Sequence, residues 1–349
     1  MHSGVFVLLA TLLLAPGCST SHSAKARAAA PPPPSPEPYV RIDNADSNLI
    51  QLQIAVRKFV PARHKGPTLW LAGVSHLGES NYYAVLQKHL DAQTLVLFEG
   101  VAGPSDEATD AKPGAASPPA SGPRAAASAA SGSASSLQSS MAAALGLVFQ
   151  LEAIDYRRPN FRHCDLSVGQ IRDLIAEQPP APGQPGAGPS FEGLLEMMQG
   201  GSWLDSLVQL GLRVIGANPK LQGLAKLALI DTICEIQGDP SRLEGLPPEM
   251  KQLLDVLLQK RNQKVIADLK TEMKKLGRRD SVAVFYGTGH MPDLERRVRR
   301  ELDYRPSGQL WLTAFSVNLA KTRITGPERA FLHDLLKHQL EQLQAQPKQ

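Results

Sequence analysis

The segment Thr68–Tyr83 reads TLWLAGVSHLGESNYY, and its pattern decides the fold class. A compact apolar run ends at Gly73, a histidine follows at His76, and helical spacing begins near Ser80. This order predicts a buried strand, a tight turn that carries a histidine, and a helix. Ligands of open α/β sheets bind where the strands end, so His76 is a candidate site residue.

Two further segments have a similar character. Ser281–Pro292 reads SVAVFYGTGHMP, with a strand, a Gly-x-x-His turn that carries His290, and the start of a helix. Thr94–Phe98 reads TLVLF and ends in Glu99-Gly100. Short strands that are apolar throughout are typical of a sheet covered by helices on both faces. We therefore expect an α/β fold, in which the helical middle of the chain forms a cap over the sheet.

The composition is that of a globular protein, with 349 residues, 42% hydrophobic and 20% charged. The formal net charge is +4, but the chain contains no long run of Lys and Arg. The arginines of 296–300 have helical spacing, which indicates a solvated helix face. We therefore expect no nucleic-acid partner.

The N-terminal residues 1–18 are expected to be a signal peptide. The apolar run Val5–Leu14 is too short to span a bilayer, and small residues precede Cys18. This pattern resembles a bacterial lipoprotein signal, in which Cys18 becomes the lipidated N-terminus. The expectation is export to the cell envelope with a lipid anchor in the membrane. Ordinary secretion, with cleavage nearby, is the alternative.

Three biased tracts divide the rest of the chain. Residues 19–40 are rich in Pro and Ala and predict a disordered tether. Residues 103–136 are almost wholly Ala, Ser, Gly and Pro and predict a disordered insertion, and 179–189 predicts a flexible loop. The remainder of 41–345 is compatible with one α/β domain.

Between these tracts, the pattern predicts several further elements. A helix is expected over Met141–Leu151, a short strand at Ala153–Tyr156, and a helix that begins at Asp165 with Asp or Ser as its cap. A long amphipathic helix is expected over Pro248–Leu276. Cys164 and Cys234 are either one disulfide or two buried thiols.

Three of the predicted strands end in a residue that can bind a ligand: His76, Glu99 and His290. If these strands are neighbours and parallel, the three side chains converge at one edge of the sheet. Two imidazoles and a carboxylate are sufficient to bind zinc, manganese, cobalt or iron. A metal with an open position lowers the pKa of water toward neutrality, which is hydrolase chemistry. Taken singly, a histidine or glutamate at the end of a strand is usually an ordinary hydrogen-bonding residue of a loop.

Other catalytic motifs are incomplete. Gly73-Val74-Ser75-His76-Leu77 lacks the second glycine of a nucleophile elbow. Gly287-Thr288-Gly289 lacks the third glycine of a dinucleotide-binding loop, and the chain contains no H-E-x-x-H.

Four motifs in order resemble the TraB/GumN/Tiki family. They are Gly73-Val74-Ser75-His76, Glu99-Gly100, Arg261-Asn262 and Gly287-Thr288-Gly289-His290. The resemblance covers about residues 68–320. It implies a mixed, largely parallel sheet flanked by helices, in a fold related to the erythromycin-esterase-like and haem-binding lipoprotein group.

The resemblance also implies a divalent-metal-dependent peptidase, which the N-terminal signal would direct to the cell envelope. His76 and His290 would be metal ligands, and Glu99 a ligand or the general base. Arg261, which the pattern alone reads as an exposed helix residue, would stabilise an oxyanion or pair with Glu99, and Asn262 would position the substrate. The metal would be manganese, cobalt or zinc, and the substrate a peptide or small molecule.

Two more residues are candidates for a supporting role. Tyr83 reads as a core residue and Asp165 as a helix cap, and either is also placed to support the site. Two other functions stay open: a metal-independent esterase of the erythromycin-esterase type, and a non-enzymatic lipoprotein that binds haem or another ligand. The sequence does not indicate an oligomeric state.

Overall fold

The computed structural model describes residues 36–100, 139–176, 211–236, 254 and 256–345. The chain divides into Met1–Ser35 and Pro36–Gln349, and all of the described residues belong to the second unit. Several predicted features lie outside the described residues: the signal with Cys18, most of the tether 19–40, the insertion 103–136 and the loop 179–189.

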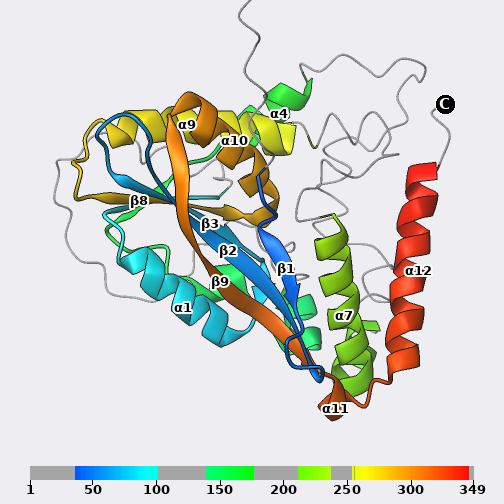
Figure 1. The fold of residues 1–349 in the computed structure, drawn as a ribbon. Helices are drawn as coiled ribbons and strands as arrows, with labels where there is room; N and C mark the ends of the chain where they lie inside the picture. Colours follow the sequence, from blue (N-terminus) through cyan, green and yellow to red (C-terminus); the bar gives the residue numbers. More distant parts are fainter. Residues whose placement is uncertain (1–35, 101–138, 177–210, 237–253, 255, 346–349) are drawn as a thin grey trace, which may run out of the picture. The chain divides into compact units, whose positions relative to one another are not determined.

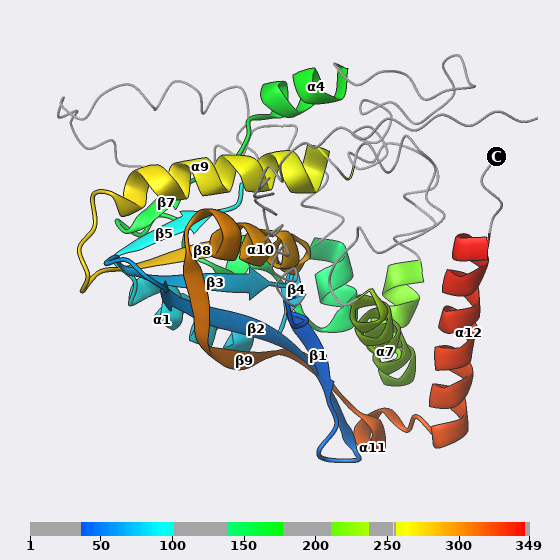
Figure 2. The ribbon, with the colours of Figure 1, turned by 45° about the horizontal axis from the view of Figure 1, so that its top comes forward.

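The fold is α/β, with a mixed, mostly parallel sheet of seven strands and about ten helices among the described residues. The strands are β1 (Val40–Asp43), β2 (Leu49–Pro61), β3 (Thr68–Val74), β5 (Leu95–Phe98), β7 (Phe161–His163), β8 (Ser281–Gly287) and β9 (Tyr304–Asn318). Their order is β1-β2-β3-β8-β5-β7, and β9 also pairs with β2 (Figure 2).

The direction of the strands matters most for the site. β3, β8, β5 and β7 pair in parallel, whereas β2 is antiparallel to β1, β3 and β9. Every described strand of this sheet except β2 therefore runs the same way. The prediction of a mixed, largely parallel sheet is confirmed.

Helices cover both faces of the sheet (Figure 1). Successive side chains of a strand point to opposite faces, and β8 is buried on both. Val282 and Val284 pack with residues of α9 (Arg261–Met273) and α10 (Met291–Glu301). Ala283 and Phe285 lie in the cluster that contains the apolar face of α1 (Ser80–Asp91). The run of apolar residues in SVAVFY is thus explained by two helical layers.

The helical middle is described only in part. α7 (Pro219–Glu235) begins after Asn218, whose side chain accepts from two backbone N–H groups of the first turn. It contacts β1, β2, β9, α11 (Leu319–Thr322) and α12 (Gly326–Ala345). Much of the rest of the predicted helical middle lies outside the described residues. Among the described helices, none is long and apolar enough to cross a membrane.

Two local predictions are wrong. The helix expected over Met141–Leu151 covers 139–145 and stops at Gly146, which has φ +63°. The N–H of Gly146 donates to Ala143 O and that of Leu147 to Ala142 O, an arrangement typical of a glycine-ended helix. Val148–Phe149 then forms the short strand β6, which pairs with β4 (Leu77–Gly78).

The strand expected at Ala153–Tyr156 is also absent from the described structure. Gln150–Ala153 is the short helix α3, and the strand comes later, as β7. The predicted helix Pro248–Leu276 is described from Val256 onward, with a π-helical turn over Val256–Lys260 before α9.

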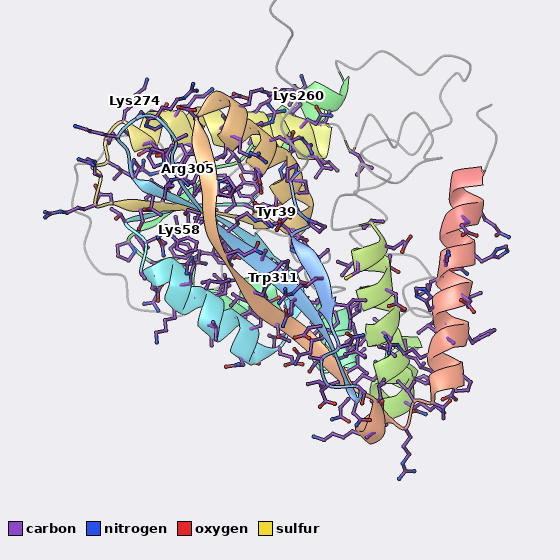
Figure 3. The ribbon with its side chains drawn as sticks, in the orientation of Figure 1. Tyr39, Lys58, Lys260, Lys274, Arg305 and Trp311 are labelled. Carbon is purple, nitrogen blue, oxygen red and sulfur yellow. The ribbon has the colours of Figure 1, made fainter. Side chains whose placement is uncertain are left out.

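A buried ion pair ties the start of the domain to α10. Arg57 Nη1 lies 2.6 Å from Glu295 Oε2, and the side chains of both are almost wholly buried. The hydroxyl of Tyr39, labelled in Figure 3, donates to the same oxygen at 2.8 Å, and its ring lies under the Arg57 guanidinium. This cluster holds α10 against β2, and α10 directly follows His290.

Both described cysteines, Cys164 and Cys234, are free. Burial raises the pKa of the Cys164 thiol, and the neighbouring Asp268 raises it further. Since the thiolate is the reactive form, we expect native Cys164 to react with a thiol reagent far more slowly than in urea-unfolded protein. Equal rates in a time course with a chromogenic disulfide would contradict this burial.

Candidate functional site

The site lies where four neighbouring parallel strands end. β3, β8, β5 and β7 are followed by His76, His290, Glu99 and Asp165 respectively. Hydrogen bonds continue past the strands, because Glu99 N donates to Phe285 O at 3.0 Å and Cys164 N to Phe98 O at 3.1 Å. The condition for convergence, neighbouring and parallel strands, is therefore met.

Gly287 gives a measure of how close the side chains come. A Cβ atom placed on Gly287 would lie 3.3 Å from Glu99 Oε2, 3.8 Å from His76 Nε2 and 4.0 Å from His290 Cδ2. His290 Nε2 also lies 3.6 Å from Glu99 Oε1. The three predicted residues thus surround one small space, which exists because residue 287 has no side chain.

Glu99 is held from two directions. Its Oε1 lies 2.7 Å from Arg261 Nη2, and its Oε2 accepts from Gly287 N at 2.6 Å. Burial acts to raise the pKa of Glu99, but His290, Arg261 and the Gly287 N–H outweigh it and lower the pKa to about 2. Glu99 is therefore a carboxylate at neutral pH.

Arg261 is buried, so the interpretation of an exposed helix arginine is wrong. Its Nε donates to Asp165 Oδ1 at 2.8 Å, and its Nη2 lies 2.5 Å from Asp165 Oδ2 and 2.7 Å from Glu99 Oε1. The Nε and Nη2 groups of Arg261 are thus both paired with the carboxylates of Asp165 and Glu99. Of the two roles that the resemblance implies, pairing with Glu99 is the one this geometry supports.

Asp165 belongs to the site and does not cap a helix. Ser167 caps α4 (Val168–Ala176): its Oγ accepts from Gln170 N at 3.2 Å, and Gln170 Oε1 accepts from Ser167 N at 2.9 Å. The side chain of Asp165 is fully buried and also accepts from Gly100 N at 3.1 Å. It therefore fixes both Arg261 and the turn after Glu99.

Asn262 is fully buried and holds His290. Its Oδ1 lies 2.7 Å from His290 Nδ1, and its Nδ2 donates to Asp293 Oδ2 at 3.0 Å. Arg297 Nε donates in turn to Asp293 Oδ2 at 2.6 Å. The structure thus places Asn262 behind the imidazole, as a residue that orients His290.

His76 is held by a residue that the sequence did not single out, Gln150. Gln150 Oε1 lies 3.1 Å from His76 Nδ1, and Gln150 Nε2 donates to Tyr156 Oη at 2.8 Å. The backbone N–H of Gln150 also donates to His76 O at 2.9 Å, beside the β4–β6 pair. The sequence placed Gln150 inside a continuous helix, so it offered no reason to connect it with His76.

Tyr83 is a core residue, as predicted, and its hydroxyl also supports the turn. It donates to Ser75 O at 2.8 Å, while the Tyr82 hydroxyl accepts from Ser75 N at 3.4 Å. Both rings pack closely on Gly78, where an added Cβ would lie 2.8 Å from Tyr82 Cδ1 and 3.1 Å from Ala314 O.

We expect Gly78→Ala to destabilise the protein by about 1–3 kcal/mol, because the methyl group must displace a buried ring or the backbone of β9. Urea unfolding measures the change. Gly308→Ala is the control, since a Cβ there meets nothing within 4 Å. Equal stability of the two variants would contradict the close packing of the His76 turn.

Three acceptors face the space over Gly287. Burial lowers the pKa of His290 to about 4 against the opposing attraction of Glu99, so the ring is neutral at neutral pH. Asn262 Oδ1 lies at Nδ1 of His290, and Gln150 Oε1 lies at Nδ1 of His76. In this arrangement of the two amides, each imidazole has a lone pair on Nε2. Two ring nitrogens and a carboxylate are the kinds of group that a divalent cation binds.

The three groups have the right chemistry to bind a cation, but their spacing in the structure does not match a metal site. Among the described residues, no three His, Cys, Asp or Glu side chains are spaced to hold a metal ion. Both oxygens of Glu99 have partners, Arg261 and the Gly287 N–H. A cation bound here therefore requires at least one of the three side chains to move.

Comparison with known proteins identified no relative of this chain. No family model matches the chain, and no curated protein and no solved structure matches it either.

Proposed function

We propose that the chain is a metal-dependent hydrolase of the cell envelope that acts on peptides through His76, Glu99 and His290. The observation that carries the proposal is the meeting of two imidazoles and a carboxylate over Gly287. The resemblance to the TraB/GumN/Tiki family adds the order of the four motifs. A divalent ion held there, manganese, cobalt or zinc, would polarise water and the substrate carbonyl.

The chain's own residues have distinct parts in this proposal. The Nε2 atoms of His76 and His290 would hold the ion. The carboxylate of Glu99 would be a third ligand or the general base that accepts a proton from water. Arg261 and Asp165 fix Glu99 in the buried wall of the site. His76 is the exposed member, so a substrate would approach from its side.

The experiment is hydrolysis of a fluorogenic peptide library by purified protein before and after chelation. We expect chelator to abolish cleavage, one divalent metal to restore it, and His290→Ala to lower the rate about 100-fold or more. His64→Ala should cleave normally, because this exposed histidine precedes β3, whereas His76 follows the other end of that strand. No cleavage by metal-replete protein across peptide and ester libraries would contradict the proposal.

A second candidate function has two observations in its favour. Glu99 is already bonded through both oxygens and no metal-like spacing exists among the described side chains, so the same residues would serve a metal-independent esterase. His76 or His290 would then activate water as a general base. Hydrolysis that continues at full rate in chelator would decide for this candidate.

Two other parts of the proposal have their own tests. Lipidation at Cys18 predicts that the protein partitions with membranes and that Cys18→Ser releases it. Haem binding through the histidines, the non-enzymatic alternative, predicts a Soret band on haem titration that His290→Ala removes. An unchanged spectrum would exclude haem.

A further inference from the structure

The hydrogen bonds behind His290 have one possible direction. A carboxylate only accepts, so Asp293 must receive from Asn262 Nδ2, which lies 3.0 Å away. The carbonyl of His290, 3.4 Å from the same nitrogen, also only accepts. The amide oxygen of Asn262 must therefore face His290 Nδ1 at 2.7 Å, and that nitrogen must carry the proton.

The hydrogen bonds behind His76, in contrast, can run in either of two directions. Gln150 lies between His76 Nδ1, at 3.1 Å, and the hydroxyl of Tyr156, at 2.8 Å. A phenol hydroxyl both donates and accepts, so it fits either end of the amide. With the amide turned over, Tyr156 donates to the Gln150 oxygen and the Gln150 nitrogen donates to Nδ1. The imidazole proton then moves to Nε2, and all three groups stay satisfied.

We propose that Gln150 is a positioning residue that selects the tautomer of His76, whereas His290 is fixed as an Nε2 lone-pair donor. In one state of Gln150, three acceptors face the space over Gly287. In the other, His76 presents an N–H there, which favours an anion or a carbonyl oxygen. The surroundings agree with this difference, because His290 is buried and His76 is exposed.

The consequence for a cation rests on the proposed function, whereas the tautomers themselves do not. Only the lone-pair state of His76 binds a cation. If that state is half populated, the apparent affinity falls about twofold. Gln150→Glu places an acceptor-only group at Nδ1, so it keeps the lone pair on Nε2. A carboxylate behind a histidine also makes the ring a stronger ligand, and the combined gain is expected to be about 10-fold.

The test is long-range 1H–15N NMR of histidine-labelled, metal-free protein at about pH 9, well above the ordinary pKa of the ring. His76→Ala and His290→Ala identify the two sets of signals. We expect His290 as a single Nδ1–H tautomer, and His76 in the wild type as a mixture that Gln150→Glu converts to Nδ1–H alone. Tautomer mixing at His290, or a single tautomer of His76 in the wild type, would overturn the proposal.

The wild-type spectra decide the matter even if Gln150→Glu does not fold. Titration of the wild type and Gln150→Glu with manganese, cobalt and zinc then separates this inference from the proposed function. A mixture at His76 without binding of any of these ions would leave the tautomer assignment standing and contradict the metal site. Binding that Gln150→Glu does not strengthen would contradict the link between Gln150 and the cation.

Discussion

Arg261→Met is expected to lower the free energy of unfolding by about 3–5 kcal/mol, because it leaves two carboxylates of a buried ion cluster without their cation. The side chain of Asp165 is fully buried and that of Glu99 is 17% exposed, so water replaces little of what Arg261 supplies. Urea unfolding followed by circular dichroism measures the loss. Arg261→Lys keeps the charge but loses the paired contact to Asp165, so its free energy of unfolding should lie between those of the wild type and Arg261→Met.

The matched control is an exposed pair of the same residue types. Arg63 Nη2 lies 2.7 Å from Asp303 Oδ1, but the Arg63 side chain is 83% exposed, so Arg63→Met should change stability little. An Arg261→Met variant as stable as Arg63→Met would contradict the role given to the buried cluster.

The same cluster predicts how stability depends on acid. The pKa of Glu99 in the folded protein is lowered to about 2, below the ordinary value for Glu of about 4.3. Its contribution to stability is therefore full above about pH 4.3 and is lost as the pH falls toward 2. Without Arg261 the pKa of Glu99 is less depressed, so Arg261→Met should show less of this acid-dependent loss. The unfolding free energy of both proteins measured across this range checks the sign.

Gly287→Ala is expected to disable the site while leaving the fold intact. The backbone of Gly287 has φ −51° and ψ 143°, which alanine adopts without strain. The methyl group takes up the space between Glu99, His76 and His290, where its nearest neighbour is a carboxylate oxygen at 3.3 Å. We expect cation affinity or hydrolysis to fall about 10–100-fold, with stability within about 1 kcal/mol of the wild type.

Gly308→Ala is again the control, because β9 has open space at that position. Normal hydrolysis by Gly287→Ala would show that the reaction takes place elsewhere. Unfolding of the variant would show that the space over Gly287 has a structural role.

The convergence of His76, Glu99 and His290 was predictable because each follows a short apolar strand beside a glycine. Such strands are buried between helices, and parallel neighbours bring their ends to one edge. The burial of Arg261 was not predictable in this way. Helical spacing gives the relative positions of side chains on α9, but only the packing of α9 on the sheet decides that Arg261 faces Glu99.

Gln150 was missed for a different reason. The run Met141–Leu151 is apolar and rich in Ala and Leu, and it has no Pro to interrupt a helix. The helix ends because Gly146 adopts a positive φ. A glycine inside a helical pattern does not by itself predict this conformation. The pairing of β6 with β4, which brings Gln150 to His76, is a contact between residues far apart in the chain.

The central claim is that His76, Glu99 and His290 form one site for one divalent cation, and cobalt titration followed by visible absorption tests it most directly. We expect the wild type and His64→Ala to bind one equivalent with a spectrum typical of nitrogen and oxygen ligands, and His76→Ala and His290→Ala to lose it. Absence of stoichiometric binding in the wild type, or the same spectrum in all four proteins, would contradict the claim.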